Sequence, residues 1–197
     1  MKKLLLILTV SITTILTAQN PLDKTVGDFS EVKVYDRIEV NLIKSDENSV
    51  VTGEDVEDVQ IINKDGKLKI RMKLDKIFNG EKTFVEVHYT SLEIIDGNEG
   101  ASITSNELME QDEISIKVQE GAKVKVGLDV DKVEIRAVTG GVIETRGKAN
   151  SQEITLNTGG VYEGKSFETK NTTVSIKAAG EAEVNATDVV DATVRAG

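Results

Sequence analysis

Apolar and polar residues alternate along most of the chain from residue 29 onward. The first example is Val32-Lys33-Val34, and the same pattern returns over residues 38–42, 59–62, 68–72 and 84–89. A period of two is expected for strands with one buried face. The pattern therefore predicts an all-β chain, and no helix fits between residues 29 and 72.

Short polar dipeptides separate these strands. Asp65-Gly66 lies between two apolar runs and predicts a hairpin, because glycine accepts the positive φ that such turns require. Asp36-Arg37 is interpreted as a turn or bulge between two strands. The stretch 74–82 is less regular and contains Asn79-Gly80, which is another turn signal.

Glycines recur at nearly fixed distances after residue 90. They occupy positions 100, 121, 140, 159 and 180, with separations of 21, 19, 19 and 21 residues. The sharpest match is Thr139-Gly140-Gly141-Val142 against Thr158-Gly159-Gly160-Val161, each preceded by an alternating strand. The chain thus contains five repeats of about 20 residues.

A repeat of this length cannot close a core of its own. Successive copies must stack, with equivalent strands paired about 4.8 Å apart. This predicts a parallel β-helix whose glycines mark the corners where the chain turns between sheets. Secondary glycines at 127, 147 and 164 are expected at the opposite corner. Antiparallel hairpins are the competing interpretation.

Both ends of the chain carry further signals. Residues 1–18 have a basic start, an apolar stretch and a small residue, Ala18, which predicts a secretory signal peptide and a mature N-terminus at Gln19. Residues 19–91 are expected to form the first rungs, and residues 92–197 the repeats of one continuous domain truncated at its C-terminus. No polar cap closes the last strand, so we expect a longer chain, another subunit or a neighbouring segment to cover it.

The composition of the chain limits which bonds, metal sites and binding partners are expected. The chain has no cysteine, which excludes disulfides and thiolate metal sites. Its formal charge of −10 becomes −12 once Lys2 and Lys3 are removed, and this opposes binding to nucleic acid or acidic lipid through the overall field. The acidity is expected to keep an exported protein soluble; the alternative is attraction of calcium or a basic partner.

The chain resembles a known family of secreted Bacteroidetes proteins, the auto-transporter adhesins with a head GIN domain. The features that carry the resemblance are the alternating openings at 29–34 and 36–42, the hairpin at 65–70, Val85-x-Val87 before Leu92, and the glycine-cornered repeats. It implies a right-handed parallel β-helix similar to the pectin lyase architecture, without established catalytic residues. It also implies adhesion at a Gram-negative cell envelope, by analogy to trimeric heads. The chain departs from the family at Glu181 and in the missing closing segment.

Candidate catalytic groups are scattered along the chain. A β-helix that cleaves polysaccharide needs clustered carboxylates, usually beside Arg or Lys. The candidates are Asp96 with Glu99, Glu110 with Asp112 and Glu113, and Asp129 with Asp131, with Arg136 or Arg146 as the nearby cation. Each carboxylate also fits a solvated turn or strand end, which is the interpretation we prefer.

The candidate metal-binding and sugar-binding residues also fit ordinary structural roles. The acidic run Glu54–Asp58 offers calcium ligands but lacks a known calcium spacing, so a solvated loop is expected. His88 is the only histidine and is expected on the outer face of a strand, with no zinc site. Tyr162 and Phe167 are the only aromatic pair within the repeats, and a glycan site would be sought there first.

We therefore expect an exported, non-catalytic β-helix module that acts as a cell-surface adhesin or binding protein. The alternatives are an envelope sensory or assembly domain and a β-helix enzyme acting on acidic polysaccharide. No catalytic, cofactor-binding or metal-binding residue is assigned, and no cofactor is expected. The expected partners are a host or cell-surface glycan or protein and, in a homotrimer, further copies of the chain. Nucleic acid and a membrane span are not expected. The expected location is the periplasm, the outer-membrane surface or the medium.

Overall fold

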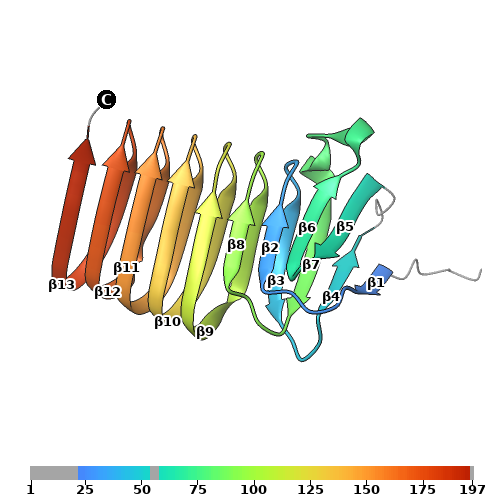
Figure 1. Cartoon of the computed structure of the whole chain (residues 1–197), viewed down its shortest axis with the longest axis horizontal. Helices are drawn as coiled ribbons and strands as arrows, with labels where there is room; N and C mark the ends of the chain where they lie inside the picture. The colour runs from blue at the N-terminus through green and yellow to red at the C-terminus, as the bar shows by residue number, and fades with distance from the viewer. Residues whose placement is uncertain (1–21, 54–57, 196–197) are drawn as a thin grey trace, which may run out of the picture.

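The fold is a β-solenoid in which strands from successive rungs lie side by side (Figure 1). It is seen in a computed structural model that describes residues 22–53 and 58–195. No helix in that part of the chain is long and apolar enough to cross a membrane. The strands are β1 Leu22–Thr25, β2 Glu31–Val34, β3 Glu39–Lys44, β4 Ser49–Thr52, β5 Val59–Lys64, β6 Lys67–Met72, β7 Phe84–Tyr89, β8 Ile94–Gly97, β9 Ser102–Val118, β10 Lys123–Val138, β11 Val142–Asn157, β12 Val161–Lys177 and β13 Glu181–Arg195.

The five long strands, β9 to β13, are the predicted repeats. They pair in parallel, and the register places Lys123 beside both Ser102 and Val142. Val142 lies beside Val161, which in turn lies beside Glu181. The parallel β-helix is therefore confirmed, and the antiparallel interpretation of the repeats is wrong.

Each long strand bends twice and so forms three arms. In β10 the register with β9 shifts between Lys125 and Gly127, and Asp131 is left out of the pairing on both sides. An irregularity of this kind bends a strand. Side chains alternate between outward and inward along the third arms of β9 to β12, and the inward ones form columns such as Ile116, Ile135, Ile154 and Val174.

The secondary glycines do not form the single stacked corner that the spacing predicted. In the strand register Gly127 pairs with Arg146, and Gly147 pairs with Phe167, so these glycines are not stacked on one another. Only Gly147 among the three has a positive φ, +109°, and a Cβ there would lie 2.1 Å from the carbonyl oxygen of Leu128. Since a bulge can bend the strand with other residues, glycine is not needed at this bend in every rung.

The remaining corner is a two-residue turn with positive φ at both positions, which is the type I′ geometry. It occurs at Glu99-Gly100, Glu120-Gly121, Thr139-Gly140, Thr158-Gly159 and Ala178-Ala179. Successive turns are joined by backbone hydrogen bonds, such as the 2.9 Å bond from Gly100 N to Glu120 O. Asp36-Arg37 begins this column, because Arg37 N donates to Glu99 O. The predicted turn there is confirmed.

The spacing predicts Gly180 in the column of turn glycines, and the structure shows that this prediction is wrong. Ala179 is the turn residue of its rung, and Gly180 follows the turn as Gly160 does one rung earlier. Gly160 and Gly180 thus form a second column of glycines. At Gly160 a Cβ would lie 2.0 Å from the carbonyl oxygen of Ala137, so glycine is required there by close packing rather than by φ. The last repeat is therefore one residue shorter than the glycine spacing indicated.

Shorter strands form the N-terminal part. β2 pairs in parallel with β6 and β8, and β3 pairs in parallel with β7 and β9. β5 and β6 form an antiparallel hairpin whose turn residues, Asp65 and Gly66, both have positive φ. The predicted hairpin is thus confirmed. Two short 3-10 turns, η2 Leu74–Lys76 and η3 Gly80–Lys82, occupy the irregular stretch after β6.

The described residues include the last strand, β13, but not the predicted signal peptide at the N-terminus. The predicted signal peptide, residues 1–18, and Gln19 lie outside the described residues, as does Gly197. β13 pairs with β12 along one edge, and Val189, Val190 and Val194 are all exposed on it. Within the described residues, no strand pairs with the other edge of β13.

Candidate functional site

A groove follows the second bend of the solenoid across β9 to β13. Its volume is about 630 Å³. Charged and polar side chains line most of it, and each rung contributes the residues around the point where its strand bends. They are Glu110, Gln111, Asp112, Asp129, Asp131, Lys148, Asn150, Glu168, Thr169, Lys170 and Thr187, together with Val130 and Ala149.

One ladder of charges runs across the groove on paired positions. The strand register places Glu110, Asp129, Lys148 and Glu168 side by side. Lys148 Nζ lies 3.2 Å from Asp129 Oδ2; the Lys148 side chain is exposed and that of Asp129 is partly exposed. An exposed pair of this kind contributes at most about 1 kcal/mol to stability. The ladder therefore matters more for the polar surface that it presents than for the fold.

A second ladder occupies the bend itself, where the residues are free of strand pairing. It consists of Asp112, Asp131, Asn150 and Lys170. Asn150 Nδ2 donates a 2.6 Å hydrogen bond to Asp131 Oδ1. This bond orients the Asp131 carboxylate, and its second oxygen remains available to accept hydrogen bonds from a ligand.

A second hollow of about 460 Å³ adjoins the groove and shares Gln111 and Asp112 with it. It adds Glu93, Glu113 and Glu134 to the lining. Gln111 Nε2 donates a 2.9 Å hydrogen bond to Leu92 O, which fixes the side chain between the two hollows. Acids thus predominate over β9 and β10, whereas the two lysines of the groove come from β11 and β12.

The structure brings several of the predicted carboxylates together. Glu110, Asp112, Asp129 and Asp131 all line the groove, although they come from two different clusters in the sequence. Glu113 lines the adjoining hollow. The signal that could have joined them is the repeat itself, because residues about 19 apart occupy adjacent rungs.

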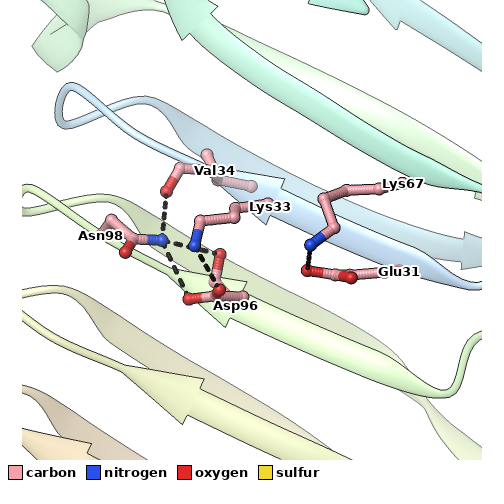
Figure 2. A network of polar contacts seen from close by, with 6 residues as sticks. All are labelled: Glu31, Lys33, Val34, Lys67, Asp96 and Asn98. Carbon is pink, nitrogen blue, oxygen red and sulfur yellow. Dashed lines mark hydrogen bonds and ion pairs between the residues drawn. The ribbon is translucent and has the colours of Figure 1, made fainter. Parts of the chain in front are cut away.

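Asp96 and Glu99 lie elsewhere. Asp96 Oδ2 is 2.7 Å from Lys33 Nζ, and Asp96 Oδ1 accepts a 2.9 Å hydrogen bond from Asn98 Nδ2 (Figure 2). Glu99 belongs to a corner turn, where partial burial raises the pKa of its carboxyl and the neighbouring Asp36 carboxylate raises it further. Both residues have structural roles near the N-terminal rungs.

The expected arginines do not line the groove. Arg146 Nη2 donates a 3.0 Å hydrogen bond to Asn106 O near the first bend, and Arg136 lies on the third arm of β10. Lys148 and Lys170 are the cations of the groove, and the sequence interpretation missed both of them. The combination of paired carboxylates with Arg136 or Arg146 is therefore not formed.

The positions of Tyr162 and Phe167 contradict the predicted sugar site. Both side chains lie in the core, with exposed fractions of 0% and 1%. The Tyr162 hydroxyl lies 2.6 Å from Thr145 Oγ1 and accepts a hydrogen bond from Gln152 Nε2. Burial raises the pKa of Tyr162 to about 12. Val161 and Glu163 point outward, so alternation directs Tyr162 into the core, and a glycan site on this pair is wrong.

The remaining metal candidates are isolated side chains. His88 is half-buried on the outer face of β7, and its Nε2 lies 4.0 Å from Glu86 Oε2. Residues 54–57 of the acidic run lie outside the described residues, while Asp58 Oδ2 is 3.7 Å from Lys76 Nζ. Across residues 22–53 and 58–195, no three His, Asp or Glu side chains are grouped so that they could hold a metal ion.

Comparisons with known proteins agree with this architecture. The chain is similar in structure to a putative adhesin from Bacteroides fragilis NCTC 9343, with a TM-score of 0.80 and 20% identity over 89% of this chain and 84% of that one. It is also similar to a putative adhesin from Parabacteroides merdae ATCC 43184, with a TM-score of 0.65 and 19% identity over 90% and 86% of the two chains. A protein from Parabacteroides distasonis ATCC 8503, described as a putative lipid binding protein, gives a TM-score of 0.60 and 18% identity over 90% and 87%.

At these identities the structural likeness establishes the fold alone. No curated protein sequence matches the chain. Among protein families, residues 28–197 match the family described as putative auto-transporter adhesin, head GIN domain. The match covers nearly all of the described residues, and the chain belongs to this family.

Proposed function

We propose that the chain is an exported, non-catalytic adhesin module that binds a cell-surface glycan or protein through the groove. Membership of an adhesin family supports a binding role at the cell surface or outside the cell. The observation that carries the proposal is the continuous row of polar side chains that crosses β9 to β13.

The groove has the dimensions and chemistry for an extended polar ligand. Neighbouring strands lie about 4.8 Å apart, so five strands span roughly 19 Å. Along this length the groove offers carboxylate acceptors, amide groups and two ammonium donors. Hydroxyl and amide groups of a polymer can pair with them, and each repeat of the solenoid presents a similar set.

The arrangement favours binding over turnover. Asp129 is paired with Lys148, and Asp131 accepts a hydrogen bond from Asn150. A general acid needs a carboxyl group that holds its proton near neutral pH, usually through burial. The groove is open to solvent and none of its lining carboxylates is buried, so it lacks the buried carboxyl group that a general acid usually requires.

The test is a glycan-array screen, together with a binding screen against outer-membrane extracts, of the purified protein and two double variants. Asp129→Ala with Lys148→Ala removes one ion pair from the groove. Lys125→Ala with Glu144→Ala is the matched control, because it removes an exposed pair of 2.9 Å from the first arm, outside the groove. Both variants leave the net charge unchanged.

We expect the groove variant to lose at least about tenfold in affinity for whatever ligand the wild type retains, which is about 1.4 kcal/mol, and the control to bind as the wild type does. Equal binding by the two variants would place the ligand elsewhere on the surface. A folded protein that binds nothing in either screen would contradict the adhesin proposal and favour an envelope sensory or assembly domain.

A further inference from the structure

The outer face of the N-terminal hairpin is basic on a chain whose net charge is −10. Along β6, Leu68, Ile70 and Met72 are buried, so the alternate residues Lys67, Lys69 and Arg71 point outward. The register adds Lys64 of β5 beside Lys67 and Lys33 of β2 beside Lys69. We refer to Lys33, Lys64, Lys67, Lys69 and Arg71 as the basic face.

Two of these cations are neutralised and three are not. Figure 2 shows Lys33 directed at Asp96 and Lys67 directed at Glu31, with Nζ to carboxylate distances of 2.7 and 2.9 Å. Lys64, Lys69 and Arg71 make no ion pair with any residue that the structure describes. Among the described residues, the basic face therefore carries three cations without a carboxylate partner, a local feature that the net charge of the chain does not reveal.

Large apolar side chains are exposed beside the basic face. The segment that follows β6 presents Leu74, Ile77 and Phe78, with exposed fractions of 74%, 42% and 49%. We refer to residues 74–78 as the apolar loop. Single exposed apolar residues are ordinary on protein surfaces, whereas several gathered in one short loop mark an interaction site.

A buried side-chain carboxylate holds the apolar loop in place. Asp36 is 3% exposed; its Oδ2 accepts a 2.9 Å hydrogen bond from Met72 N, and its Oδ1 accepts a 3.1 Å bond from Phe78 N. One buried carboxylate thus holds both the end of β6 before the loop and the last residue of the loop. Phe78 has a φ of +64°, which is an outlier for a bulky residue. Strain of this kind persists where the surroundings impose it, commonly at functional sites.

A small cavity joins the two features. It has a volume of about 190 Å³ and is lined by Lys69 and Arg71 from the basic face, by Leu74 and Ile77 from the loop, and by Tyr35, Asp36, Met72 and Glu99. Both carboxylate oxygens of Asp36 already accept backbone hydrogen bonds, and the two cations face Glu99 as the one other acid of the lining. An anionic headgroup can approach the two cations, while the neighbouring apolar side chains enter the acyl boundary. This combination of cations and apolar groups is typical of proteins that lie on a membrane surface.

We propose that the basic face and the apolar loop dock the protein on an anionic phospholipid bilayer. Lys69 and Arg71 contact lipid phosphates, and Leu74, Ile77 and Phe78 enter the headgroup region. An anionic polysaccharide would pair with the cations equally well, but it would gain nothing from the exposed apolar side chains. The loop therefore favours lipid over a soluble polyanion.

The test is co-sedimentation with vesicles of phosphatidylglycerol and phosphatidylcholine, compared with vesicles of phosphatidylcholine alone. Each cation near an anionic surface contributes about fivefold to binding, so we expect Lys69→Ala with Arg71→Ala to weaken it roughly 25-fold. Lys123→Ala with Lys165→Ala is the matched control; it removes two exposed cations, on β10 and β12, that make no ion pair with any residue the structure describes, and it should bind as the wild type does. Added salt should weaken wild-type binding.

A second variant separates lipid from polyanion. Leu74→Ser with Ile77→Ser leaves the charges intact, and we expect it to lose vesicle binding at least about tenfold while retaining the circular dichroism spectrum of the wild type. If this variant binds vesicles normally and dextran sulfate displaces both proteins, the face recognises a soluble polyanion and the lipid proposal is wrong. Equal binding to vesicles of phosphatidylcholine alone would also overturn it.

Discussion

Tyr162→Phe removes one oxygen atom from a polar cluster inside the solenoid. The Tyr162 hydroxyl lies 2.6 Å from Thr145 Oγ1 and accepts a hydrogen bond from Gln152 Nε2. Thr145 and Gln152 are themselves buried, with exposed fractions of 1% and 4%. The substitution leaves the Gln152 amide without this partner in a region that water does not reach.

A buried polar group without a partner costs about 1–3 kcal/mol, and we expect Tyr162→Phe to lower the free energy of unfolding by about 2 kcal/mol. Equilibrium unfolding in urea measures the change. Tyr35→Phe is the control, because Tyr35 is half-buried on the outer face of the N-terminal rungs; its effect should stay within about 0.5 kcal/mol.

A double-mutant cycle gives the result that would refute this reasoning. Gln152→Leu removes the stranded amide, and Thr172 keeps its 2.7 Å contact with Thr169. The double variant Tyr162→Phe with Gln152→Leu should therefore lose less stability than the two single variants together. Strict additivity, or a loss below about 0.5 kcal/mol for Tyr162→Phe alone, would show that the cluster does not stabilise the fold.

Three further predictions concern the corners and the loop. Gly160→Ala places a Cβ 2.0 Å from Ala137 O and should lower the melting temperature more than Gly140→Ala, where nothing lies within 4 Å and only αL strain of about 1–2 kcal/mol is added. Glu99→Gln should stabilise the protein at pH 7 and have no effect below pH 4.5, the ordinary pKa of the group. The reason is that the raised pKa of Glu99 in the folded state makes its ionisation destabilising as the pH rises. Equal effects on the melting temperature at both pH values would contradict this sign. Asp36→Asn removes one acceptor from the anchor of the apolar loop and should speed tryptic cleavage at Lys73 and Lys76; unchanged cleavage would mean that the carboxylate does not hold the loop.

The strands, the hairpin and the stacked repeats could be predicted from the sequence because each depends on local spacing. Alternation indicates which residues face inward, and it also places Tyr162 in the core, although an aromatic residue beside a corner is also compatible with sugar binding. The column of Gly180 could not be derived from spacing alone. A glycine required by φ and a glycine required by close packing look the same in a sequence, and only the structure separates Gly159 from Gly160.

The groove and the basic face were missed for different reasons. Asp131, Asn150 and Lys170 are distant in sequence, and they meet only when a register relates adjacent rungs. The sequence shows Lys67, Lys69 and Arg71 at alternating positions, but the overall charge of −10 does not reveal a local group of cations. A net charge describes the distant field of a protein, whereas a docking surface depends on charges within about 8–10 Å, the range left by screening in physiological salt.

The two proposed surfaces should act independently, which gives a final prediction. Along the third arm of the solenoid the strand order runs from β6 through β2, β8, β9 and β10 to β11, so at 4.8 Å per strand roughly 19–24 Å separates Lys69 and Arg71 on β6 from Asp129 and Lys148 on β10 and β11. Substitutions farther apart than about 10 Å are usually additive. Lys69→Ala with Arg71→Ala should therefore leave ligand binding at the groove unchanged, and Asp129→Ala with Lys148→Ala should leave vesicle binding unchanged. Loss of both activities in either variant, with the fold intact, would mean that a single extended ligand contacts both surfaces and that the two proposals must be replaced by one.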